Sequence, residues 1–97
     1  MDYKHASTAD ILEETGARLK AIRIRNKLKQ TELAEHLGLS VKAIQTAEGG
    51  KNITLKTLIP LLQFYDRIDA FEELLPDTVM SPREIFLNNR DNRKRVR

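Results

Sequence analysis

Four residues near the middle of the chain combine side chains that could bind a ligand, namely Val41, Lys42, Gln45 and Thr46. At helical spacing they project from one side of a helix over residues 41–48. Their side chains are a branched apolar group, a cation, a primary amide and a hydroxyl. In a DNA major groove lysine donates to guanine, an amide pairs with adenine, and methyl groups contact thymine. Ordinary surface helices share this composition, so it does not by itself indicate DNA binding. The predicted elements on either side must show whether this helix is placed to enter a groove.

A short helix is predicted just before this stretch, over residues 30–37. Leu33, Ala34 and Leu37 lie at i, i+1 and i+4 and therefore share one apolar stripe. Gly38 follows at the position where helices commonly end in the left-handed region, which glycine adopts at little cost. The pattern predicts a tight turn at Gly38.

The second helix is predicted to begin after Ser40, whose hydroxyl can accept a backbone N–H as an N-cap. Within residues 41–48, Ile44 and Ala47 lie three apart and face back toward the first helix. Two short helices joined by a glycine turn, with an outward face on the second, describe a helix-turn-helix.

The stretch QTELAEHLGLSVKAIQTAEGG resembles the Cro/cI-type, or XRE-like, helix-turn-helix family. The residues that match the pattern of the family are Gln30, Ala34, Gly38, Ser40, Ile44 and Glu48. Two positions depart from it. Lys29 stands where the family often has Thr or Asn, and Ala43 stands where relatives are frequently polar.

The resemblance covers residues 17–76 and implies an all-α fold, a lambda-repressor-like five-helix DNA-binding domain. We therefore divide the chain into a flexible arm (1–10), the helix-turn-helix domain (11–76), and a short C-terminal helix with a basic tail (77–97). In relatives, an arginine in the first helix pairs with the glutamate that ends the reading helix. These residues are Arg23 and Glu48 here, and losing one partner of a partly buried pair costs about 3 kcal/mol. Two unrelated surface charges are the alternative.

Phosphate contacts are expected where the backbone or a cation can approach DNA. Gln30 begins a helix, where free N–H groups and the helix dipole attract anions. Gly49 and Gly50 provide a turn that can approach a phosphate closely. For Lys56, contact with DNA and exposure to solvent are both open. The candidates are Lys27, Lys29, Gln30, Ser40, Lys51, Asn52 and Lys56.

The first helix is expected to begin at Thr8 or Asp10, and Gly16 leaves open whether it is one long helix or two pieces. Leu19 and Ile22 should pack inward, with Ile24 as a further candidate.

A fourth helix is predicted after the cap residue Thr54, with a kink or a shortened first turn caused by Pro60. A short fifth helix capped by Asp69 should end before Pro76. In relatives this last helix contributes to the dimer contact.

Beyond residue 76, Ser81-Pro82-Arg83-Glu84 forms a capping box that predicts a helix through Asn88. Either its apolar residues 85–87 or the fifth helix could form the dimer interface. The tail from Arg90 to Arg97 either follows DNA or is a disordered basic segment.

The 97 residues suit one small domain, and the absence of Cys excludes a disulfide framework. No apolar run could cross a membrane, so we expect a cytoplasmic protein without membrane partners. Residues 17–56 hold nine Lys and Arg against three Glu, a net charge of +6. Such a basic segment suits a polyanion.

Together these features predict a DNA-binding repressor that binds an inverted-repeat operator in double-stranded DNA as a homodimer. The alternative is an antitoxin similar to the HipB type, which would also bind a HipA-like toxin kinase. An enzyme has little support, because His5 and His36 have no partner motif and neither a metal nor a cofactor is implied. The scattered aromatic residues also disfavour RNA stacking.

Overall fold

The computed structural model describes residues 1–77 and residue 83, and this part of the chain folds into five helices without a strand. The predicted all-α fold is confirmed, and the two helices of the helix-turn-helix begin and end at the predicted residues. In chain order the helices are α1 (Thr8–Arg25), α2 (Gln30–Leu37), α3 (Val41–Glu48), α4 (Leu55–Phe64) and α5 (Ala70–Leu74).

The first helix, α1, is a single long helix, which answers the question that Gly16 left open. Its cap is Ser7, whose Oγ accepts a hydrogen bond from the Asp10 backbone N–H at 3.0 Å. Thr8 and Asp10, the expected caps, lie inside the helix. The last residues of the predicted arm 1–10 therefore belong to α1.

Gly16 is buried because α1 crosses the end of α3 at this residue. A Cβ atom built on Gly16 would lie 2.6 Å from the Ala47 carbonyl oxygen and 2.7 Å from that of Glu48. A Cβ on Gly50 would in turn lie 2.8 Å from the Cα of Glu13. Two glycines thus allow backbone to pack directly on backbone.

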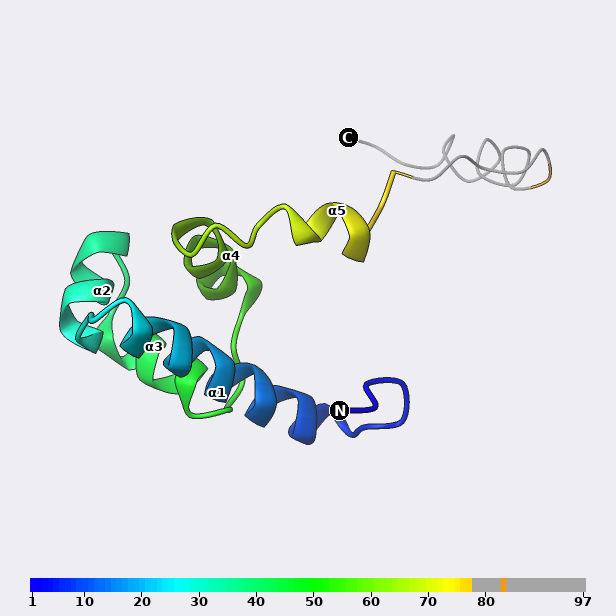
Figure 1. Cartoon of the computed structure of the whole chain (residues 1–97), viewed down its shortest axis with the longest axis horizontal. Coiled ribbons are helices and arrows are strands. Elements are labelled where there is room, and N and C mark those ends of the chain that lie inside the picture. The colour runs from blue at the N-terminus through cyan, green and yellow to red at the C-terminus, as the bar shows by residue number, and fades with distance from the viewer. Residues whose placement is uncertain (78–82, 84–97) are drawn as a thin grey trace, which may run out of the picture.

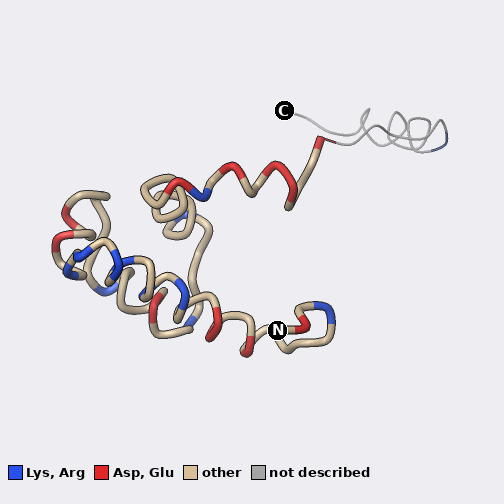
Figure 2. The backbone as a smooth tube through the Cα atoms, in the orientation of Figure 1, with Lys and Arg blue, Asp and Glu red and all other residues tan. Residues whose placement is uncertain are grey.

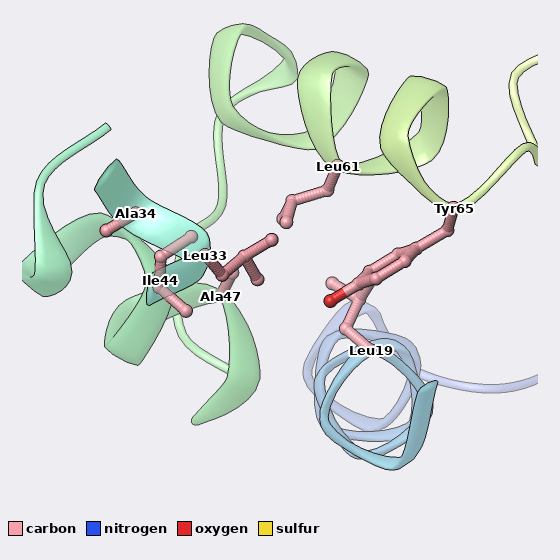
Figure 3. Close-up of a cluster of buried hydrophobic side chains, with 7 residues drawn as sticks. All are labelled: Leu19, Leu33, Ala34, Ile44, Ala47, Leu61 and Tyr65. Atoms are coloured by element: carbon pink, nitrogen blue, oxygen red, sulfur yellow. The ribbon is translucent and has the colours of Figure 1, made fainter. Parts of the chain in front are cut away.

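The core forms around α3, which packs against α1, α2 and α4 (Figure 1). Leu33 of α2 and Ile44 of α3 are fully buried and face each other as the sequence predicts. Leu61 and Tyr65 point from α4 and its C-terminal end toward the other three helices (Figure 3). The buried apolar residues are Leu19, Leu33, Ala34, Ile44, Ala47, Leu61 and Tyr65.

Pro60 lies inside α4, and the helix continues through it to Phe64. The helix begins at the predicted cap, because Thr54 Oγ1 accepts from the Thr57 backbone N–H at 3.3 Å. Leu61, which follows the proline, is buried and anchors the helix on the core.

Two expectations about single residues are wrong. Ile24 is 56% exposed, because the inward position one turn after Leu19 belongs to Arg23. Asp69 precedes α5, but its side chain makes no capping hydrogen bond. Its backbone is helical (φ −61°, ψ −21°), whereas a capping residue has an extended backbone.

The last described helix, α5, lies beyond α4 and away from the group formed by α1, α2 and α3 (Figure 1). Apart from Arg83, the predicted C-terminal helix and the tail from Arg90 to Arg97 lie outside the described residues.

Candidate nucleic-acid interface

The turn between α2 and α3 sets the start of the candidate reading helix. Gly38 adopts the left-handed conformation (φ 69°, ψ 30°), which a residue with a side chain adopts less readily. Ser40 then caps α3, since its Oγ accepts from the Ala43 backbone N–H at 3.0 Å. Because a serine hydroxyl keeps its own proton when it accepts, Ser40 can still donate to a phosphate.

The outward side of α3 presents the four predicted base-reading residues with unequal access. Lys42 and Gln45 are exposed, whereas Val41 and Thr46 are half-buried. Val41 also packs against the edge of the core. The side chains with the longest reach and the strongest hydrogen-bonding groups are therefore the most accessible ones.

Arg23 and Glu48 meet in the interior, where the Arg23 Nε donates to the Glu48 Oε2 at 2.7 Å. The two side chains are 11% and 4% exposed, so the ion pair is shielded from water. A second donor of the same guanidinium, Nη1, bonds to the Leu28 carbonyl oxygen at 2.7 Å. This arginine therefore links α1, the connection to α2, and the last residue of α3.

Gln30 joins the same network from the first residue of α2. Its Nε2 donates to the other carboxylate oxygen of Glu48, Oε1, at 3.0 Å. The side chain that the sequence analysis assigned to phosphate binding thus points to a carboxylate of the protein. The backbone N–H of Gln30 remains at the N-terminus of α2, where it suits an anion.

Electrostatic effects follow the geometry of this network. The hydrogen bond to Glu48 raises the pKa of Arg23, against the opposing effect of burial. Burial raises the pKa of the Tyr65 phenol, and the nearby Glu48 carboxylate adds to that rise. The Tyr65 hydroxyl is buried without a hydrogen-bond partner.

The candidate phosphate contacts lie on separate segments. Lys27 and Lys29 are exposed in the connection between α1 and α2, and Lys27 has a left-handed backbone (φ 59°). Lys29 precedes α2, and its backbone N–H donates to the Glu32 Oε1 at 2.8 Å in place of a side-chain cap.

Two further candidates, Lys51 and Asn52, are exposed in the loop after α3. The loop turns at Gly50 (φ 73°), and the Lys51 backbone N–H donates to the Thr46 carbonyl oxygen at 3.1 Å. Lys56 is exposed on the first turn of α4.

A family model described as "Helix-turn-helix" matches residues 19–71, which is more than half of the chain. The chain belongs to the Cro/cI-type helix-turn-helix family. It is therefore a DNA-binding regulator of the XRE type. A search of curated proteins found no match.

Positive charge in this helix-turn-helix protein is concentrated in the second half of α1 and in the connection to α2. Residues 15–31 contain six Lys and Arg and no Asp or Glu. In Figure 2 the cations follow the second half of α1 and the connection to α2, while acidic residues mark the start of α1 and α5. A polyanion would be attracted to this basic segment rather than to the acidic start of α1 or to α5.

Sequence reasoning missed three contributors to the site. The sequence leaves open whether Gly16 divides the first helix, and it was not foreseen that Gly16 allows α1 to contact the end of α3. Tyr65 and the Leu28 carbonyl, both beside Arg23, were also not foreseen. Only Gly16 had a signal, since a glycine inside a helical pattern also occurs where another backbone approaches.

Within residues 1–77 and 83, no three His, Asp or Glu side chains gather as a metal site would require. No helix of this described part is long and apolar enough to cross a membrane.

Proposed function

We propose that this helix-turn-helix protein is a sequence-specific transcriptional repressor that binds an inverted-repeat operator as a homodimer. The observation that supports the proposal best is the two-sided character of α3. Ile44 and Ala47 are buried, while Lys42 and Gln45 on the opposite side are exposed. A helix held by its apolar side and presenting a cation and an amide suits insertion into a major groove.

In this proposal Lys42 and Gln45 contact base edges, with Val41 and Thr46 beside them. Contacts to phosphates from both sides of α3 hold its register on the duplex. The candidates for these contacts are Lys27, Lys29, Gln30 through its backbone, Ser40, Lys51, Asn52 and Lys56. The basic middle of the chain favours such an arrangement.

A homodimer is proposed because a single short helix reads only a few base pairs, so useful affinity requires two copies on adjacent half-sites. Leu74 and Leu75 at the end of α5 are 66% and 74% exposed. Two neighbouring leucines in water favour burial against a second copy. Repression follows if the dimer occupies a promoter and blocks polymerase.

An antitoxin similar to the HipB type is the second hypothesis. It keeps the DNA-binding role and adds a HipA-like toxin kinase as a partner. Both hypotheses require a homodimer for DNA binding, so the presence of a kinase partner separates them. Co-purification of a co-encoded kinase with the tagged chain would favour the antitoxin, and full operator affinity of the chain alone, with no such partner, would favour the repressor.

The test of the proposed function is selection of binding duplexes from a random-sequence pool, followed by anisotropy titration. We expect an inverted repeat to emerge. At about 150 mM salt it should bind at least about a thousandfold more tightly than a scrambled duplex. Equal, weak binding of both duplexes would contradict the proposal.

A further inference from the structure

The hydrogen bond between Gln30 and Glu48 closes the helix-turn-helix at its open end. The C-terminal end of α2 and the N-terminal end of α3 are joined through the turn at Gly38. At the other ends of the same two helices, Gln30 is the first residue of α2 and Glu48 is the last residue of α3. Their 3.0 Å hydrogen bond therefore joins the ends that the chain does not connect directly.

This hydrogen bond also satisfies a buried carboxylate. The Arg23 Nε bonds to Oε2 of Glu48, and Gln30 is the donor found for Oε1. The Glu48 side chain is 4% exposed, so water has little access to replace the missing donor. Leaving a buried charged acceptor without a partner costs free energy. A displacement of α3 that exposes the Glu48 carboxylate to water would reduce this cost.

We propose that the Gln30 side chain is a positioning residue that fixes the direction of α3 relative to α2. It acts through Glu48, and its effect is on the placement of Gln45, which lies one turn before Glu48. A direct phosphate contact by this side chain would be a different role. The inference rests on the proposed function of α3 as the reading helix.

The first test is Gln30→Met, which keeps the length of the side chain and the helix propensity but removes the donor. The probes are the duplex that the wild-type protein selects from a random pool and a scrambled duplex. We expect about a tenfold loss of affinity for the selected duplex and unchanged affinity for the scrambled one. The matched control is Gln63→Met, the same change at an exposed position of α4. Equal losses on both duplexes, or no loss, would overturn the proposal.

A second variant, Gln30→Glu, gives a pH profile that a simple packing role does not produce. It places a carboxylate against Glu48 of α3, with Arg23 of α1 and the Tyr65 phenol after α4 facing the pair. The charged residues beside Gln30 in the sequence are Lys29, which precedes α2, and Glu32 in its first turn. Two adjacent carboxylates raise the pKa of the pair, and a single proton then restores a donor.

For Gln30→Glu we therefore expect the ratio of affinities for the selected and scrambled duplexes to fall at about pH 7.5 and to recover at about pH 5.5. The wild-type ratio at the same two pH values is the control. A ratio that stays low at the acidic pH, or a recovery that is equal on both duplexes, would overturn the proposal. The pH dependence of this affinity ratio also tests the positioning role of Gln30 if Gln30→Met does not fold.

Hydrogen exchange without DNA separates this inference from the proposed function. The Gly49 backbone N–H donates to the Gln45 carbonyl oxygen at 2.9 Å, and the Lys51 N–H donates to that of Thr46 at 3.1 Å. Both amides should exchange faster in Gln30→Met than in Gln63→Met. Unchanged exchange would overturn the positioning role, whereas failure of the wild-type protein to select any duplex would overturn the proposed function alone.

Discussion

Gln45 and Lys51 are both exposed polar residues, yet the contacts proposed for them differ in kind. Gln45 lies on the outward side of α3, and Lys51 lies in the loop that follows. A base-edge contact discriminates between sequences, whereas a phosphate contact stabilises binding to any duplex. Substitution of Gln45 should therefore change the sequence preference, whereas substitution of Lys51 should change the affinity for all duplexes.

Replacing Gln45 with alanine should weaken binding to the selected duplex by about 1–3 kcal/mol and relax the preference at one base pair. The physical reason is the loss of an amide that pairs with a base edge. Competition titrations against duplexes that carry each of the other bases at every position would measure this. Unaltered discrimination at every position would mean that the reading surface is elsewhere.

Replacing Lys51 with alanine should weaken binding to the selected and scrambled duplexes alike. Because one fewer counterion is released, the slope of log affinity against log salt should flatten by about one unit. Titrations at several salt concentrations give the slope, and Lys4→Ala, the same change at an exposed position of the N-terminal arm, is the control. A loss confined to the selected duplex would argue against a phosphate contact.

Tyr65 carries a buried hydroxyl without a partner, so Tyr65→Phe should not destabilise the fold. The free energy of unfolding should stay the same or rise by up to about 1 kcal/mol, since an unsatisfied polar group is removed. Burial raises the pKa of this phenol in the folded state. Above about pH 10 the unfolded chain therefore loses this proton more readily than the folded chain does, and wild-type stability should fall.

Urea denaturation at neutral and alkaline pH would measure both effects. At alkaline pH the free energy of unfolding of Tyr65→Phe should fall less than that of the wild type, because the variant has no phenol at this position to ionise. Tyr3, which is exposed, is the control position for the same substitution. A loss of stability at neutral pH in Tyr65→Phe would show that the hydroxyl has a partner in solution.

At the scale of helices, the sequence was informative wherever the signal is local. The caps Ser40 and Thr54 were foreseen because their side chains bond to a backbone N–H three residues later. The helical positions of Ile44 and Ala47 likewise show which side of α3 is buried. These signals all lie within a single turn of helix.

Contacts between distant residues were not foreseen in the same way. The Gln30 side chain bonds to a residue 18 positions later, and Gly16 meets the carbonyl groups at the end of α3. Neither spacing corresponds to a helical period, so no local pattern indicates it. The pairing of Arg23 with Glu48 came from resemblance to a family rather than from spacing.

The crossing of α1 and α3 predicts the outcome of Gly16→Ala. Helix propensity alone would stabilise α1 by about 1 kcal/mol. The new methyl group, however, would lie within 2.7 Å of backbone atoms of α3 and Gly50, which cannot rotate away. We expect a net loss of about 1–3 kcal/mol in the free energy of unfolding, because the helices must separate.

Urea denaturation of Gly16→Ala would test this expectation. The control is Ala17→Gly, because Ala17 is exposed on the same helix and reports propensity alone. A more stable Gly16→Ala protein would contradict the close approach of the two backbones.

For the whole molecule, the proposed homodimer predicts the geometry of the operator. The two reading helices should occupy major grooves about 34 Å apart, so half-site centres should be separated by about 10 base pairs or a multiple of that. Inserting about five base pairs between the half-sites would turn one of them to the opposite side of the duplex.

Anisotropy titration of the selected duplex and of duplexes with about five or about ten inserted base pairs would measure the effect of the insertion. Affinity for the altered duplex should fall to that of a single half-site. An insertion of about ten base pairs should not restore it, because the half-sites then face the same side but lie about 34 Å further apart than a rigid dimer spans. Affinity of either altered duplex equal to that of the selected duplex would contradict a rigid dimer on adjacent half-sites.

The crossing at Gly16 also bears on how much of the chain is needed to form a stable structure. The family region begins at residue 19, yet α1 begins at Thr8 and its first half lies against the end of α3 and the loop at Gly50. A shortened chain starting at residue 19 would uncover the end of α3 and lose the cap at Ser7. We therefore expect the minimal folding unit of this protein to be larger than its family region and to extend back at least to Ser7.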